Sequence, residues 1–231
     1  MEINMNLHHK LVNKVMSITM ILCLTSLSVN AETTKKAQTN EQEVVAIKTS
    51  LETTVVNVDD KSFSCIREMT PVRHFYVDNL LGNIESTLTA ANAPKGAVYP
   101  AGSVVQLVPT EVMVKRESGT SPATGDWEFF ELDVNEKGSM IAKRGFVDVV
   151  NRFDGNCFSC HAPAREPWDF ICELGHGCEP IPIDHKMTGA LQRSDPRCGD
   201  AELEDGDSMA LFKLKAMVTI GLTKKWIEGL F

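Results

Sequence analysis

Apolar and polar residues alternate most regularly between residues 103 and 150. The segment 103–115 (SVVQLVPTEVMVK) is rich in β-branched residues, and Pro109 within it indicates an edge or a bulge. The segment 126–134 (DWEFFELDV) alternates aromatic or aliphatic residues with acidic ones, as a half-buried strand does. A third strand is expected over 140–150. The pattern therefore predicts an antiparallel sheet of three strands joined by two hairpins.

Helical spacing of apolar residues is found on both sides of this block. Over residues 72–92 the spacing is three or four, which predicts a helix that ends before Ala93 and Pro94. Over 208–231 it predicts an amphipathic helix packed on the body of the protein, with a role of its lysines at a membrane surface as the alternative. A sheet of three strands buries little by itself, so flanking elements are needed to complete the core.

These elements predict an α+β fold. It comprises an antiparallel β-rich core with flanking helices, followed by a loop-rich, disulfide-braced C-terminal extension punctuated by prolines. The expected divisions are a signal peptide over 1–31, a flexible lead-in over 32–60 that could contain a short strand within 43–58, and one domain over 61–231. The domain is expected to consist of a β-rich core over 95–155, the motif over 157–161 and the extension over 162–231.

The first residues have the composition of an export signal. Lys10 and Lys14 precede the apolar run 15–27, and small residues lead up to Ala31. That run is shorter than the roughly 20 residues that span a bilayer. We therefore expect cleavage after Ala31 and a periplasmic location, without stable membrane insertion.

Charge excludes some partner classes. The chain has 23 Lys and Arg against 31 Asp and Glu; without two basic residues and one acidic residue of the signal, its net charge is −9. Such acidity argues against nucleic acid and against an anionic membrane surface as partners.

Six cysteines remain after Ala31, and two of them belong to the run Cys157-Phe-Ser-Cys160-His161. Cys-x-x-Cys-His is the attachment signature of c-type haem. The thiols of Cys157 and Cys160 are expected to form thioethers with the two vinyl groups, and His161 is expected to be the axial iron ligand. The other four, Cys65, Cys172, Cys178 and Cys198, can form two disulfides in three possible pairings.

Other chemistries of this motif remain open. Zinc would recruit further ligands, for which Cys172, His176 and Cys178 lie nearby in sequence. Thiol redox chemistry usually comes with a βαβ context, whereas antiparallel strands precede the motif here. Export favours haem, because haem c is attached outside the cytoplasm. One motif implies one haem.

The sixth iron ligand separates two functions. A Met or His ligand would make an electron carrier, the leading interpretation, whereas an open site would bind or oxidise small nitrogenous molecules such as nitric oxide or hydroxylamine. Candidate ligands are Met69, Met113, Met140, Met187, Met209, His74, His176 and His185, and candidate residues of an apolar open pocket are Phe129, Phe130, Phe146 and Phe153. The partner is then a redox protein or a small gas. A zinc or disulfide-stabilised binding module without haem is the third hypothesis.

The order of these features resembles the cytochrome P-460 and cytochrome c-prime-beta family. The resemblance rests on the segment 99–105 (YPAGSVV), the segment 125–130 (GDWEFF) and the motif region 155–164 (GNCFSCHAPA). It implies a β-rich monohaem cytochrome c, with a sheet that precedes and cradles the haem, and a tendency to form dimers. Cys157, Cys160 and His161 are the residues that carry over.

The chain departs from that family in two ways. Here 70 residues follow His161, whereas the family motif lies near the C-terminus. Some members cross-link a lysine to the haem and oxidise hydroxylamine, but nothing in the sequence selects Lys115 or Lys143 for that role. The rival architecture is a helical cytochrome c domain over 150–231, which the terminal helix favours and the strand alternation disfavours.

Overall fold

The computed structural model describes residues 55–228, with side chains up to Gly221, and the expected signal peptide lies outside this range, as do residues 32–54 of the expected lead-in. The strands are β1 (Thr70–Val72), β2 (Phe75–Asn79), β3 (Ser103–Val108), β4 (Glu111–Lys115), β5 (Trp127–Asn135) and β6 (Gly138–Gly145). The helices are α2 (Ile84–Ala91), α3 (Cys157–His161), α4 (His185–Arg193) and α5 (Asp207–Glu228), and short 3-10 turns lie at Asp60–Ser62, Ile66–Glu68, Pro122–Thr124, Ala162–Ala164 and Pro196–Cys198.

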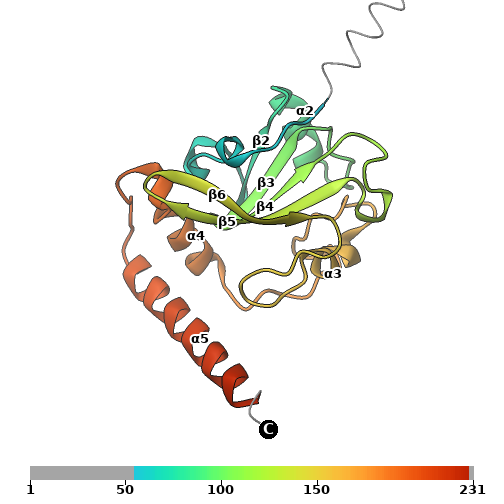
Figure 1. The fold of residues 1–231 in the computed structure, drawn as a ribbon. Helices are drawn as coiled ribbons and strands as arrows, with labels where there is room; N and C mark the ends of the chain where they lie inside the picture. Colours follow the sequence, from blue (N-terminus) through green and yellow to red (C-terminus); the bar gives the residue numbers. More distant parts are fainter. Residues whose placement is uncertain (1–54, 229–231) are drawn as a thin grey trace, which may run out of the picture. The chain divides into compact units, whose positions relative to one another are not determined.

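The six strands form one antiparallel sheet in the order β1 to β6, with each strand paired to the next along the chain (Figure 1). The α+β class and the antiparallel core predicted from sequence are confirmed. The segment expected to form one strand over 103–115 forms two, β3 and β4, joined by a turn at Pro109 and Thr110. Proline fits this turn because it has no backbone N–H to donate to a neighbouring strand. Only residues 140–145 of the strand expected over 140–150 are in a strand, because β6 starts at Gly138 and ends at Gly145; residues 146–150 belong to no strand.

The helix predicted over 72–92 is wrong for its first half. Residues 70–79 form the β1–β2 hairpin, whose turn places Arg73 at a φ of 52°. Phe75 and Val77 are buried while Tyr76 and Asp78 between them are more exposed, which is the period of a strand. Only Ile84–Ala91 is helical. The mixed spacing of apolar residues that suggested one helix arises because a strand, β2, and a helix, α2, follow each other in this segment and have different periods.

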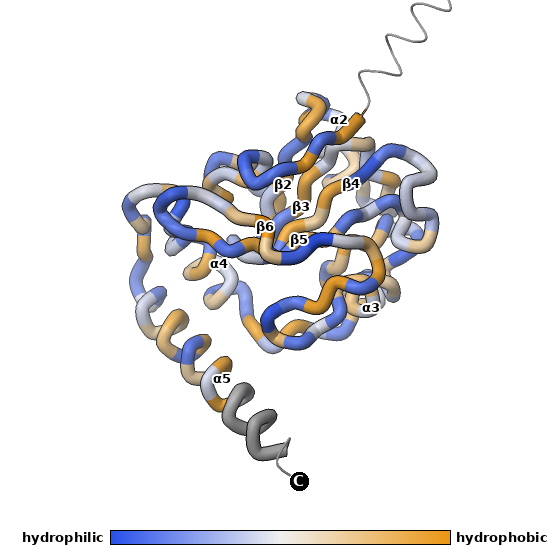
Figure 2. The backbone as a smooth tube through the Cα atoms, viewed as in Figure 1, coloured by the Kyte–Doolittle hydropathy of each residue, from blue (hydrophilic) through white to orange (hydrophobic). Residues whose placement is uncertain are grey.

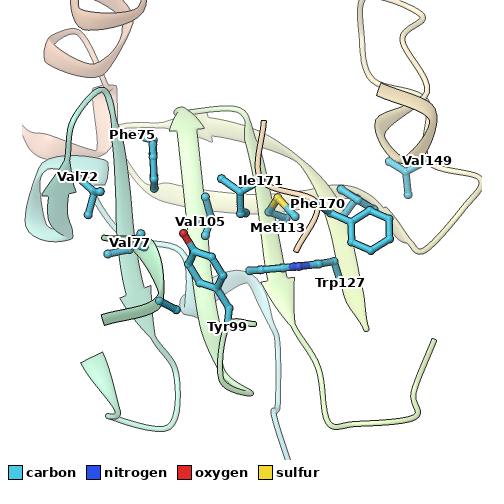
Figure 3. Close-up of a cluster of buried hydrophobic side chains, with 13 residues drawn as sticks. Val72, Phe75, Val77, Tyr99, Val105, Met113, Trp127, Val149, Phe170 and Ile171 are labelled. Atoms are coloured by element: carbon cyan, nitrogen blue, oxygen red, sulfur yellow. The ribbon is translucent and has the colours of Figure 1, made fainter. Parts of the chain in front are cut away.

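Two apolar clusters cover opposite faces of the sheet. On the first face Val105, Met113 and Trp127 point from β3, β4 and β5 toward the segment that carries Phe170 and Ile171 (Figure 3). The second face is covered by a cluster made of Val56, Phe63, Val104, Val112, Val114, Phe130 and Leu132. Successive residues of each strand alternate between the clusters, so four of the five residues of β4 and the first six of the nine residues of β5 are buried. Val56, within the expected lead-in, has no exposed surface.

Two disulfides join the four cysteines that lie outside the motif in the described residues. Cys65 pairs with Cys198, 133 residues away, and Cys172 pairs with Cys178. The expectation of two disulfides is confirmed, and the pairing left open by the sequence is settled in the structure. The first bond ties the segment before the sheet to the turn after α4, and the second closes a small loop after the motif.

A buried ion pair lies next to the first disulfide. The carboxylate of Asp195 accepts hydrogen bonds from the Ile66 backbone N–H at 2.9 Å and from the Arg197 guanidinium at 2.6 Å, and both side chains are almost fully buried. Burial by itself acts to raise the pKa of Asp195, but these hydrogen bonds outweigh it and the pKa lies below the usual value.

We expect Asp195→Asn to lower the free energy of unfolding by about 2 kcal/mol at neutral pH, since a hydrogen-bonded charge is lost. A carboxyl whose pKa is lower in the folded state stabilises the fold above its unfolded pKa, and this contribution disappears as the pH falls through the folded value. Urea unfolding should therefore show a difference between wild type and variant that shrinks from neutral to strongly acidic pH. A difference that does not change with pH would contradict this assignment.

Candidate functional site

The motif Cys157–His161 forms the short helix α3. Its N-terminus is capped by Asn156, whose side chain accepts a hydrogen bond from the Ser159 N–H at 2.8 Å. The N–H of Cys157 donates to the carbonyl of Val149 at 3.0 Å, which ties α3 to the chain leaving β6. Because residues three apart lie on one side of a helical turn, Cys157 and Cys160 are brought to the same side.

The imidazole of His161 is fixed by a backbone carbonyl. Its Nδ1 lies 2.7 Å from the carbonyl oxygen of Phe170. A carbonyl only accepts, so Nδ1 carries the proton and Nε2 carries the lone pair. Burial lowers the pKa of His161, which keeps the ring neutral. An oriented, neutral imidazole with its second nitrogen available is the state that an axial metal ligand requires.

The Phe170 carbonyl is itself held in place by buried contacts of its neighbour Asp169. The Nζ of Lys115 lies 2.6 and 2.7 Å from the two carboxylate oxygens of Asp169, and the Tyr99 N–H donates to the same carboxylate at 2.8 Å. The indole N–H of Trp127 donates to the Asp169 carbonyl at 2.7 Å. Burial lowers the pKa of Lys115 and raises that of Asp169, while their mutual attraction opposes both changes.

Apolar surface adjoins α3. The Phe129 ring on β5 lies 5.4 Å from the His161 ring, and Cys157 itself packs against the first core cluster. A cavity of about 270 Å³, bounded by residues 143–150, lies beside the start of α3. Next to it, Val147, Val150 and Phe153 have 39, 37 and 55% of their surface exposed. Exposed apolar groups on the segment that leads from β6 into α3 suit an apolar, planar cofactor.

The thiols of the motif are free in the described part of the chain, in contrast to the four cysteines in disulfides. Burial, assisted by the nearby Glu111 carboxyl, raises the pKa of Cys157 to about 11 and also raises the pKa of Cys160. Reactive redox thiols have a lowered pKa. The electrostatics therefore argue against thiol exchange at this motif.

Two carboxylates, one buried (Glu131) and one partly buried (Glu111), lie on the same face of the sheet. Glu111 and Glu131 are opposite each other on β4 and β5, and burial followed by repulsion from Glu131 raises the pKa of Glu111. Glu131 accepts a hydrogen bond from Arg152 at 2.7 Å, and Asn151 donates to Glu111 at 3.0 Å. Sequence reasoning missed this pair, because each residue occurs at an ordinary alternating position of a strand.

The zinc alternative loses its expected ligands. Cys172 and Cys178 are bonded to each other, and the His176 ring stacks on Trp168 at 3.8 Å with its Nδ1 against the Ile171 carbonyl. Within residues 55–228, no cluster of three or more His, Cys, Asp or Glu side chains is arranged to hold a metal ion.

The candidate sixth ligands are dispersed. Met113 is buried in the first core cluster, Met69 lies with the second cluster on the other face of the sheet, Met187 is partly buried on α4, and Met140 and Met209 are exposed. The rings of His74 and His185 lie 4.1 Å apart and tilted by 33°, and both His74 and His176 line a separate cavity of about 340 Å³.

The candidate pocket phenylalanines are also divided. Phe129 contacts His161 and Phe146 lines the cavity beside α3, while Phe153 is exposed and Phe130 faces the opposite cluster. Of the two candidate cross-linking lysines, Lys115 is paired with Asp169, and Lys143 donates to the Val150 carbonyl at 2.7 Å.

No helix in the described part of the chain is long and apolar enough to cross a membrane. Comparison with protein-family models, with curated proteins and with solved structures finds no match to this chain.

Proposed function

We propose that this protein is a periplasmic monohaem c-type cytochrome that transfers electrons. Cys157 and Cys160 would hold the porphyrin through thioethers, and His161 would supply the axial nitrogen. When bound, haem c supplies an iron that takes up and releases one electron. The observation that carries the proposal is the combination, within one helical turn, of two free thiols and an imidazole whose Nδ1 is bonded to the Phe170 carbonyl.

The other residues of the site have supporting roles. The Phe170 carbonyl orients His161 and increases the basicity of its Nε2, as outer hydrogen bonds to metal-bound histidines do. Phe129 and the first core cluster exclude water from the sheet side of the imidazole. Cys160 and Ser159 are exposed, so α3 lies at the surface of the protein. A redox group held at the surface can exchange electrons with a partner protein, which favours electron transfer over chemistry in an enclosed pocket.

Two disulfides support export to an oxidising compartment, where such bonds persist. The resemblance to the cytochrome P-460 and cytochrome c-prime-beta family is retained as part of this proposal. It is supported by an antiparallel sheet that precedes the motif and packs against it. The long extension with α4 and α5 remains a departure from that family.

Absorption spectroscopy of the purified protein tests the proposal. We expect a Soret band with low-spin features in both oxidation states, because an electron carrier keeps its iron six-coordinate. A high-spin spectrum that shifts on addition of nitric oxide would replace electron transfer by gas binding. Absence of a Soret band after expression with haem-attachment machinery would refute the haem assignment itself.

A further inference from the structure

Helix α5 extends beyond the element on which it packs. Its first turn is anchored, since Asp207 and Ala210 are buried and Arg193 of α4 bonds the Asp207 carboxylate at 2.7 Å. Beyond this turn the helix runs away from the sheet (Figure 1). Apolar residues nevertheless continue along it (Figure 2). A polar surface would be expected on a helix that serves only as a solvated tail.

Three of the four large apolar side chains that are exposed on the described part of α5 gather on one side, and the fourth, Met217, is 40% exposed and lies about 60° beyond them. Met209, Phe212 and Ile220 have 58, 67 and 65% of their surface exposed. At 3.6 residues per turn they fall within an arc of about 80° on the helix, with Ala216 in the middle of the arc. Leu211 and Leu214, which are more buried, lie on the other side. We call the outward set (Met209, Phe212, Ala216 and Ile220) the outer stripe.

The charge around the outer stripe is opposite to that of the chain. Residues 208–227 contain four lysines, at 213, 215, 224 and 225, and no acidic residue, in a chain whose net charge is −8. By helical geometry Lys213 borders one edge of the outer stripe and Lys215 lies beyond the other. The helix has 22 residues and is about 33 Å long, which is several times the Debye length of about 8 Å at physiological salt. The acidic residues of the rest of the chain are therefore largely screened from its far end, and the charges on the helix itself decide what it attracts.

We propose that the outer stripe of α5 binds the surface of an anionic lipid bilayer. Met209 and Phe212 enter the interface, and the flanking lysines extend their ammonium groups to the lipid phosphates. A second copy of this chain fits less well, because pairing two outer stripes would bring their flanking lysines together, and the acidic residues of α5 are confined to its two ends, Asp207 and Glu228. The acidity of the whole chain, which argued against a membrane surface, does not apply to this helix. The inference does not depend on the haem assignment.

Co-sedimentation of the full chain with vesicles tests this inference. We expect binding to vesicles of phosphatidylcholine mixed with phosphatidylglycerol and none to phosphatidylcholine alone. Met209→Ser with Phe212→Ser should weaken the binding by about tenfold, because the apolar area that these side chains bury in the bilayer interface is lost. Lys213→Gln with Lys215→Gln should weaken it by about thirtyfold, at about 1 kcal/mol for each lysine.

Matched controls use surface residues elsewhere. Val98→Ser removes an apolar side chain that is 76% exposed, and Lys137→Gln removes a lysine from the exposed β5–β6 turn; neither should change vesicle binding. Circular dichroism would check that each variant is folded. The proposal is overturned by equal binding of wild type and the double serine variant, by absence of binding to the anionic vesicles, or by a dimer in light scattering that the serine variant dissociates.

Discussion

The variant with both Cys157→Ala and Cys160→Ala should lose all covalently held haem. Both thiols are free and lie on one side of α3, and they are the only free thiols among the described residues. Without them no thioether can form, so haem staining on a denaturing gel should fall to background. Each single variant can retain one thioether and should stain more weakly than wild type.

The second disulfide provides a close control. Cys172→Ala with Cys178→Ala also removes two cysteines from the segment after β6, but these are bonded to each other rather than free. Haem staining of this control should equal that of wild type when corrected for the amount of protein. If the control loses haem and the motif variant keeps it, the attachment site has been assigned to the wrong pair.

The features that could be predicted from the sequence are those formed by residues close together in the chain. The motif over 157–161 is contiguous, and a single helical turn suffices to bring its three functional groups together. Likewise β5 and β6 were predicted because their alternation and the turn between them are local. The β1–β2 hairpin has no such signal, because its turn uses Arg73 at a positive φ where a glycine or asparagine would be expected.

The groups that support the motif could not be predicted, because they come from distant parts of the chain. The carbonyl that holds His161 belongs to Phe170, and a backbone carbonyl has no sequence signature. Lys115 and Asp169 are 54 residues apart, and each is unremarkable within its own segment. For the same reason the sequence left three pairings of the four cysteines open, whereas in the structure Cys65 and Cys198 meet because the turns Ile66–Glu68 and Pro196–Cys198 pack against each other.

Lys115→Met should destabilise the protein by about 3–5 kcal/mol, because it leaves the Asp169 carboxylate buried without its partner. Both side chains are only 7% exposed. Lys143→Met is the matched control on β6 of the same sheet, where the lysine side chain is 51% exposed and lies 3.1 Å from Glu131. A partly exposed pair contributes about 1 kcal/mol or less, so the control should unfold at nearly the wild-type urea concentration.

The loss of unfolding free energy caused by Lys115→Met should become smaller as the pH falls, because Asp169 becomes protonated. Burial raises the pKa of this carboxyl, and removal of Lys115 takes away the charge that opposed the increase. An acid with a raised folded-state pKa destabilises the fold above that value, and the penalty disappears as the pH falls below its unfolded pKa of about 4. Unfolding curves should therefore converge on those of wild type at acidic pH, and Asp169→Asn added to Lys115→Met should recover part of the loss at neutral pH.

The same variant separates a structural role from a role at the site. Asp169 directly precedes Phe170, whose carbonyl accepts the hydrogen bond from His161. In Lys115→Met, only the hydrogen bonds of Asp169 with Tyr99 and Trp127 would remain to hold this segment in place. We therefore expect Lys115→Met to shift the reduction potential of the haem protein in conditions where it remains fully folded, whereas Lys143→Met should not. An unchanged potential would show that the ion pair stabilises the fold without orienting the imidazole. A shift confined to Lys115→Met would connect the buried pair, through one backbone carbonyl, to the axial ligand.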